Sequence, residues 1–322
     1  MKSSLRSSLL LLLTAMIWGL AFVAQDVAME SVRAFTFNGA RMMLAALMLL
    51  VVCAVLEKKA ASQPEKNDGT TIPLKRMSSA QKKQLLIAGL LCGSVLAVAS
   101  SLQQIGLEQG AAPGKAGFIT ALYIVLVPIC GLFFGKKLRL VLIPAVVFSV
   151  AGLYLLCMTD SADAASGLRL ETADIYLILC ALGFTAHILI IDYFSPRTDC
   201  VKLSCLQFFV CSIICIIMAC IFEKPRWPQL LDCLVPLLYA GLLSGGLGYT
   251  LQMVAQKDLD PTVASLIMCL ESVFAVLGGL IILKDGMSHY EYIGCALMMC
   301  GILLAQWPEK KGLSAPKIPS GE

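Results

Sequence analysis

Ten long apolar runs, separated by short polar segments, constrain this chain more than any other feature. A transmembrane helix needs about 20 apolar residues, and each run approaches that length. The runs are too long and too evenly apolar for the alternating strands of an outer-membrane barrel. They lie at Leu9–Gln25, Ala34–Leu56, Leu85–Leu107, Ala116–Gly135, Leu140–Thr159, Ile175–Ile191, Leu203–Phe222, Leu234–Val254, Thr262–Leu283 and Tyr292–Trp307. The sequence therefore predicts an all-α polytopic membrane protein with ten transmembrane helices.

The composition agrees with a chain that lies largely in lipid. Apolar residues make up 58% of the 322 residues and charged residues 14%, whereas soluble domains carry about 25% charged residues. The mean hydropathy is +0.83. Lys2 and Arg6 before the first run resemble the start of a cleaved signal peptide, but nine further runs follow. We therefore expect the first run to be retained as a helix.

Basic residues in the loops predict the orientation of the chain. With the N-terminus inside, 18 of the 25 Lys and Arg residues fall in inner segments and six in outer loops. Both termini are thus expected in the cytoplasm of a bacterial cell, with the chain in its inner membrane. The net charge of +4 belongs to short loops beside the membrane, so no nucleic-acid partner is expected. A polar linker over 57–84 and a polar tail over 308–322 are expected on the cytoplasmic side.

The two halves of the sequence resemble each other. At a separation of 148 positions Gly93 falls on Gly241, Gln104 on Gln252 and Pro113 on Pro261; at 166 positions Asp26 falls on Asp192 and Arg41 on Gln207. A repeat of five helices, an odd number, inserts in opposite orientations in its two copies. The sequence therefore predicts two inverted modules, over 9–159 and 173–307, with a site near the bilayer midplane between them.

Three segments carry a resemblance to a known family. They are "AMIWGLAFVAQDVAMESVRAFTFNGARMMLAAL" (Ala15–Leu47), "KAGFITALYIVLVPICGLFFGKKL" (Lys115–Leu138) and "LESVFAVLGGLIILKDGMS" (Leu270–Ser288). Together they resemble the modules of the EamA-type drug/metabolite transporter family. The resemblance implies a secondary transporter that exports a small organic metabolite, an amino acid or related solute, by alternating access. It implies that helices one to four and six to nine surround a cavity, with helices five and ten at the periphery.

The sequence departs from the family pattern at three places. Family members often end the fourth and ninth helices with a Gly-Glu pair, where this chain has Gly135-Lys136 and Lys284-Asp285. The Glu of the ninth helix is often followed by Pro, and here Ser272 follows Glu271. Contacts at the exit side and a proline kink in the ninth helix are therefore not expected to follow the family pattern.

Two charged residues lie well inside predicted helices, and they are the centre of the predicted site. By helical rise Glu271 lies about 13 Å and Arg41 about 10 Å from opposite helix ends, so a direct or water-bridged pair is possible. The repeat places Gln207 opposite Arg41 and Tyr123 opposite Glu271. Charged groups are costly in hydrocarbon and normally face a cavity or a partner. The candidate substrate-binding residues are Trp18, Asn38, Arg41, Gln104, Tyr123, His187, Gln207, Tyr249, Gln252 and Glu271.

Structural roles remain open for these residues. Arg41 could clamp helices or reach the outer surface, and Glu271 could be a protonated carboxyl bonded to a neighbouring helix. Gln104 and Gln252 could be interhelical hydrogen bonds. His187 suits either a proton relay or simple packing, and Trp18 either lines the cavity or packs tightly at the adjacent glycine. Five glycines are expected at close helix contacts: Gly152, Gly278, Gly279, Gly294 and Gly301.

No catalytic or metal-binding motif competes with a transporter. The chain has no phosphate-binding glycine loop and no nucleophile with a plausible base. Its 14 Cys mostly lie in apolar runs as small fillers, and the two His are far apart, so no metal and no cofactor are expected. The alternatives are an intramembrane enzyme, with Glu271 and His187 as acid and base, and a membrane sensor or receptor. The expected partners are a small solute and the lipid bilayer; proton coupling, and monomer against homodimer, stay open.

Overall fold

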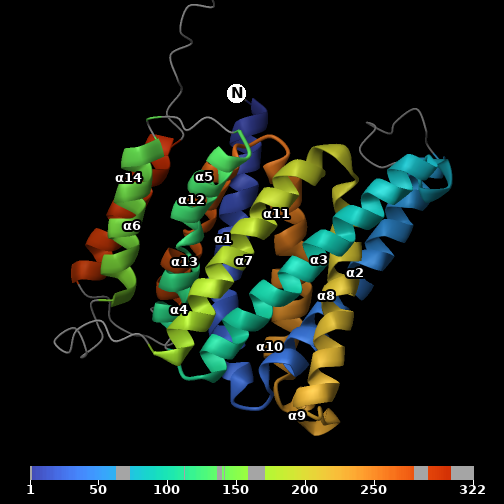
Figure 1. Cartoon of the computed structure of the whole chain (residues 1–322), viewed down its shortest axis with the longest axis horizontal. Coiled ribbons are helices and arrows are strands. Elements are labelled where there is room, and N and C mark those ends of the chain that lie inside the picture. Colours follow the sequence, from blue (N-terminus) through green and yellow to red (C-terminus); the bar gives the residue numbers. More distant parts are fainter. Residues whose placement is uncertain are drawn as a thin grey trace, which may run out of the picture.

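The computed structural model describes residues 2–62, 73–111, 113–135, 140, 142–158, 171–278 and 289–305. All regular structure within these residues is helical, and the helices run side by side as one bundle (Figure 1). The predicted all-α class is therefore confirmed.

Six helical stretches are long and apolar enough to cross a bilayer. Five are single helices: α1 (Lys2–Met29), α2 (Ala34–Ser62), α3 (Ser79–Glu108), α7 (Thr172–Phe194) and α8 (Cys200–Phe222). The sixth joins α10 (Leu234–Leu238), a π-helical segment (Tyr239–Tyr249) and α11 (Thr250–Gln256). The other helices are α4 (Pro113–Thr120), α5 (Tyr123–Phe133), α6 (Leu142–Met158), α9 (Trp227–Asp232), α12 (Pro261–Met268), α13 (Glu271–Gly278) and α14 (His289–Ala305).

The helices α2 and α3 extend into the predicted polar linker. Glu57, Lys58 and Lys59 continue α2, which ends at Ser62, and a short 3₁₀ turn, Leu74–Arg76, precedes α3. Ser78 caps α3: its hydroxyl accepts from the backbone N–H of Gln81, and the Gln81 side chain accepts from the N–H of Ser78. Reciprocal capping of this kind fixes the start of α3 before its apolar run begins.

Carboxylates from two other helices cap the start of α2. Glu223, just after α8, accepts from the backbone N–H groups of Phe35 and Thr36 at 2.8 and 2.7 Å. Glu108, at the end of α3, accepts from Ala34 N and pairs with Arg33 at 2.7 Å. The first N–H groups of a helix lack partners in the helix itself, so these carboxylates satisfy them. The hydrogen bond to Glu108 also raises the pKa of Arg33 above its ordinary value.

Two predicted helices are each interrupted in the middle. α4 ends at Thr120 and α5 begins at Tyr123, while α12 ends at Met268 and α13 begins at Glu271. Bonds from each N–H to the carbonyl three residues back tighten both breaks, as in Leu122 N to Ile119 O and Leu270 N to Ile267 O, each 3.2 Å. The second break forms although no proline follows Glu271. The predicted runs that begin at Ala116 and Thr262 therefore each contain a break.

The helices pack in pairs that join distant parts of the chain. α2 lies against α8, α3 against α7 and α8, and α1 against α13 and the π-helical segment. α6 and α14 pair with each other at one side of the bundle (Figure 1). Many exposed side chains are large and apolar, including Val51, Phe133 and Leu303. Such a surface suits contact with lipid rather than water.

Glycines set the distance between α6 and α14. A β-carbon on Gly152 would lie 2.5 Å from the Gly294 carbonyl oxygen, and one on Gly301 would lie 2.3 Å from Ser149 Oγ. Real β-carbons do not approach other atoms so closely, so only glycine lets these backbones meet. The predicted close contacts at Gly152, Gly294 and Gly301 are confirmed. The surroundings of Gly278, and all of Gly279, lie outside the described part of the chain.

Gly152→Ala tests this contact. The added methyl group must separate α6 from α14, and overpacking of this kind costs about 1–3 kcal/mol. We expect a lower midpoint of thermal unfolding in detergent. Gly117→Ala is the matched control, because its nearest new neighbour, Ser272 Oγ, would lie at an ordinary 3.7 Å. Equal midpoints for both variants would contradict the close contact.

Candidate functional site

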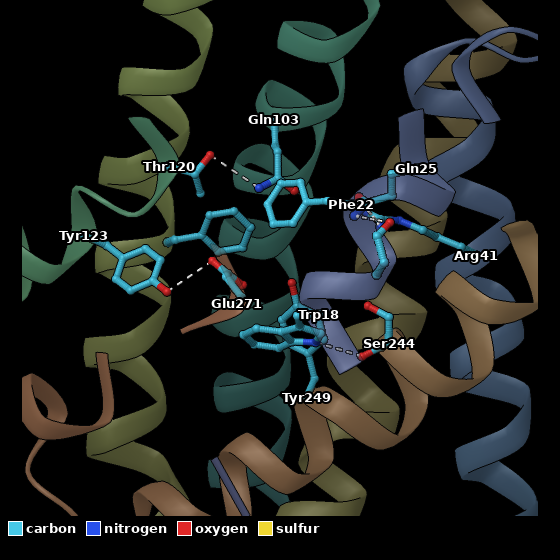
Figure 2. A pocket seen from close by; sticks show the side chains of 12 residues that line it. Trp18, Phe22, Gln25, Arg41, Gln103, Thr120, Tyr123, Ser244, Tyr249 and Glu271 are labelled. Atoms are coloured by element: carbon cyan, nitrogen blue, oxygen red, sulfur yellow. Dashed lines mark hydrogen bonds between the residues drawn. The ribbon is translucent and has the colours of Figure 1, made fainter. Parts of the chain in front are cut away.

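A pocket lies at the centre of the bundle, where the two helix breaks face α1 (Figure 2). Its cavity volume of about 50 Å³ is enough for a few water molecules but not for a metabolite. A larger occupant would therefore require the helices to move. The lining residues are Trp18, Ala21, Phe22, Gln25, Arg41, Gln103, Thr120, Tyr123, Phe184, Ser244, Tyr249 and Glu271.

Neutral amides hold Arg41 in the wall of the pocket. Its Nη1 donates to Gln25 Oε1 at 2.6 Å and its Nε to Asn38 Oδ1 at 2.8 Å. Gln25 is fixed in turn. Its side-chain Nε2 donates to the backbone carbonyl of Ala21, and its backbone carbonyl accepts from Gln104 Nε2. These bonds join α1, α2 and α3. They orient the guanidinium without neutralising its charge.

Glu271 is the first residue of α13 and faces the pocket from the second helix break. Tyr123, the first residue of α5, donates its hydroxyl to Glu271 Oε1 at 3.3 Å. Gly19 brings α1 directly against this break, since a β-carbon there would lie 2.5 Å from the Glu271 carbonyl oxygen. A carboxylate at the start of a helix also interacts favourably with its dipole. Both breaks thus meet at one hydrogen bond beside α1.

The sequence allows a direct or a water-bridged pair between Arg41 and Glu271, and the direct pair is not formed in the described structure. Among the described residues no ion pair within 4 Å joins them, and each has its own neutral partner. Arg41 and Gln25 lie on one side of the pocket, Glu271 and Tyr123 on the other, with Trp18 between (Figure 2). Gln25 and Tyr123 fill hydrogen-bonding positions on the two charged groups instead. The charges share a pocket, but each remains available to an occupant.

Aromatic rings close one end of the pocket. Trp18 donates its indole N–H to the Ser244 carbonyl at 3.1 Å, and its ring lies 4.6 Å from that of Tyr249. The Tyr249 ring also makes T-shaped contacts with the rings of His187 and Phe208, whose centroids lie 5.9 and 5.5 Å from its own. Tyr249 therefore separates the pocket from the residues around His187.

Five of the ten predicted site residues line the pocket, and five do not. Those that line it are Trp18, Arg41, Tyr123, Tyr249 and Glu271. The others are buried outside the lining: Asn38 supports Arg41, Gln104 bonds Gln25, His187 pairs with Gln207 at 3.0 Å, and Gln252 lies in α11. His187 and Glu271 are thus not brought together as an acid and base pair.

Seven lining residues were not predicted. They are Ala21, Phe22, Gln25, Gln103, Thr120, Phe184 and Ser244. One signal was present, because Trp18, Phe22 and Gln25 recur at helical spacing and so share a face of α1. No comparable pattern marks Gln103, whose neighbour Gln104 matches better in the repeat.

One protein-family model matches nearly the whole chain. The family model described as the EamA-like transporter family matches residues 5–158 and again 171–307. The chain belongs to the EamA-like transporter family. The resemblance predicted from the sequence is confirmed, and the chain is a multi-pass membrane transporter.

Two individual proteins are similar to this transporter. An uncharacterized transporter of Archaeoglobus fulgidus is 26% identical over 295 residues, which cover 91% of this chain and 83% of the relative. A protein crystal structure with 15% identity superposes with a TM-score of 0.70, covering 94% of this chain and 96% of the other. At that identity the likeness concerns the fold alone.

Gly248→Ala tests the observed position of the Trp18 indole ring. A β-carbon there would lie 2.6 Å from the indole nitrogen, so the ring must leave the Ser244 carbonyl and Tyr249. In a background where Trp227 and Trp307 are replaced by Phe, we expect a shifted emission maximum for Trp18. Gly117→Ala in the same background should leave the emission unchanged. An unchanged spectrum in Gly248→Ala would show that the indole is not held there.

Proposed function

We propose that this chain is a secondary transporter of the bacterial inner membrane that exports a small zwitterionic metabolite, an amino acid or related solute, by alternating access. The observation that carries the proposal is the central pocket with one guanidinium and one carboxyl group, each held by neutral partners. The family supports transport of a solute, and the pocket supports its chemistry.

The two charges favour a solute that carries both signs. A charge taken out of water needs compensation, and neutral hydrogen bonds provide only part of it. The planar guanidinium of Arg41 can bind a carboxylate with two parallel hydrogen bonds. Glu271 on the opposite wall can accept from an ammonium group, and Trp18 and Tyr249 offer an apolar surface to the body of the solute.

Glycine contacts support the inverted repeat. A β-carbon on Gly93 would lie 2.6 Å from the carbonyl oxygen of Gln207, and one on Gly241 would lie 2.9 Å from that of Arg41. The two glycines are 148 positions apart, and Arg41 and Gln207 are 166 apart. Each module thus packs its third helical span against the second span of the other module at equivalent positions.

The helix breaks, and the carboxylates that contact helix starts, are also related by separations of 148 and 166 positions. Tyr123 and Glu271, 148 positions apart, each begin the second half of a broken helix. The Glu223 carboxylate accepts from a backbone N–H at the start of α2. The Oε1 atom of Glu57, 166 positions earlier, lies 3.3 Å from Lys202 Nζ near the start of α8. We therefore count α4 with α5, α10 with α11, and α12 with α13 as one span each. This grouping gives ten spans, five in each module.

An odd number of spans per module places the two modules in opposite orientations, which is the architecture of alternating access. The excess of basic residues in the predicted inner segments supports a cytoplasmic position for the start of α1. A cysteine introduced in place of Trp227, which is 80% exposed beside α10, should then react with an impermeant thiol reagent on intact cells. A cysteine in place of Lys75 should react only after permeabilisation. The reverse pattern would overturn the orientation.

Glu271 is also the proposed carrier of a coupling proton. Glu271 is 5% exposed, and the one hydrogen bond to its carboxyl group in the described structure comes from the neutral phenol of Tyr123. A carboxyl group in such a site can hold or release a proton as the occupant changes. Glu271→Gln keeps the shape of the side chain and removes this capacity.

Transport itself is tested in proteoliposomes with a panel of amino acids and related zwitterions, with and without an imposed pH gradient. We expect flux of an unmodified solute from the wild type, and no response to the gradient in Glu271→Gln. Arg41→Lys keeps the charge but loses the bidentate geometry. A charge-assisted hydrogen bond contributes about 1.5–3 kcal/mol, so the half-saturation concentration should rise about 10- to 100-fold.

The controls for flux are two exposed residues, in the variants Glu30→Gln and Arg76→Lys, which should behave as the wild type. Wild-type flux and gradient response in both pocket variants would refute the proposed roles of Glu271 and Arg41. A chemically altered solute would instead favour an intramembrane enzyme.

A further inference from the structure

A second polar cluster lies outside the pocket, between α7 and α8. His187 Nε2 and Gln207 Oε1 are 3.0 Å apart, and the two residues are 1% and 0% exposed. Their remaining polar atoms, His187 Nδ1 and Gln207 Nε2, are buried without a hydrogen-bond partner. A buried polar atom without a hydrogen-bond partner is destabilising. Each member of this pair therefore keeps one polar atom available for a further hydrogen bond, as Asn38 Nδ2 and Gln104 Oε1 do near Arg41.

Other unsatisfied polar atoms occur in the same half of the bundle. Gln252 Oε1 and both amide atoms of Gln256 are buried without partners in α11. This half is the one where α1 begins and where α2, α7 and α11 end. The pocket extends from the middle toward the opposite half, along Trp18, Phe22 and Gln25 of α1.

Tyr249 divides the two polar regions. Its side chain lines the pocket, and its ring also meets the edge of His187. Nothing else that lines the pocket is in ring contact with His187 within the described chain. Movement of this one ring would connect the central pocket with the cluster.

The repeat relates the cluster to the pocket itself. At a separation of 166 positions His187 corresponds to Ala21, Ile191 to Gln25, and Gln207 to Arg41. Ala21, Gln25 and Arg41 all line the pocket. In transporters with inverted repeats the two modules exchange conformations when access alternates. The counterparts of lining residues then line a cavity that opens to the other side.

We propose that His187, Gln207 and Ile191 line a second half-site, closed in this structure, that opens toward the end of the bundle where α1 begins. This inference rests on the proposed alternating access and adds the residues of the second state. The unsatisfied imidazole and amide atoms then serve a polar solute and its water when Tyr249 moves aside. Unlike Arg41 on the pocket side, the three residues of this half-site offer neutral donors and acceptors and an apolar surface.

Thiol accessibility tests the half-site without knowledge of the solute. Single cysteines replace Ala21, His187 or Ile191 in a background whose native cysteines are changed to Ala or Ser. Each variant is treated with an impermeant thiol reagent on intact cells and on inside-out vesicles. Leu203→Cys is the matched control, because Leu203 is fully buried and its counterpart, Phe37, does not line the pocket.

We expect Ala21→Cys to react from the side where α1 ends, and His187→Cys and Ile191→Cys from the opposite side. The pocket of about 50 Å³ must itself open before the reagent reaches Ala21→Cys, so all three variants should react more slowly than an exposed cysteine. They should still react faster than Leu203→Cys. Ile191→Cys keeps the test decisive if His187→Cys does not fold.

Two contrary outcomes are distinguishable. If Ala21→Cys reacts from one side while His187→Cys and Ile191→Cys react no faster than Leu203→Cys, the second half-site is overturned and the proposed transporter stands. If Ala21→Cys and His187→Cys react from the same side only, alternating access itself fails, and the proposed function with it.

Discussion

The absence of water in the bilayer core governs the rest of this structure. Every backbone N–H and carbonyl in hydrocarbon needs a partner within the protein, so the chain crosses the membrane as helices. An interruption is tolerated only where the protein itself surrounds it. Both broken helices accordingly meet at the centre, where Tyr123 and Glu271 begin their second halves and Gly19 lets α1 approach. The pocket lies where these two breaks are buried by the surrounding helices.

The same constraint explains how the two pocket charges are held. Arg41 and Glu271 could have neutralised each other, yet each is bonded to neutral groups, Gln25 and Asn38 on one side and Tyr123 on the other. Neutral partners fix orientation while leaving charge for an occupant. A buried ion pair would compete with a charged solute for the same groups. This arrangement is the basis of the proposed binding of a charged solute.

In the proposed repeat the two modules place different side chains at corresponding positions. Arg41 in α2 has Gln207 as its counterpart in α8, and the amide of Gln25 is replaced by the apolar side chain of Ile191. The hydrogen-bond partner of Gln207 is instead His187, which lies one helical turn before Ile191 in α7. At Gly93 and Gly241 the corresponding contacts are similar, because each glycine approaches a backbone carbonyl and an apolar side chain, Val210 or Leu44. Side chains facing the centre are free to diverge.

The sequence by itself determined the helical class, the family and the principal charged residues, because apolar length and the cost of buried charge act locally along the chain. It also determined five lining residues, among them Arg41 and Glu271. Tertiary structure decided the rest. Whether Gln103 or Gln104 faces the pocket depends on the rotation of α3, and Gln25 meets Arg41 only because α1 packs beside α2. Helix rotation and neighbour choice arise from side-chain packing between distant segments, which no local pattern records.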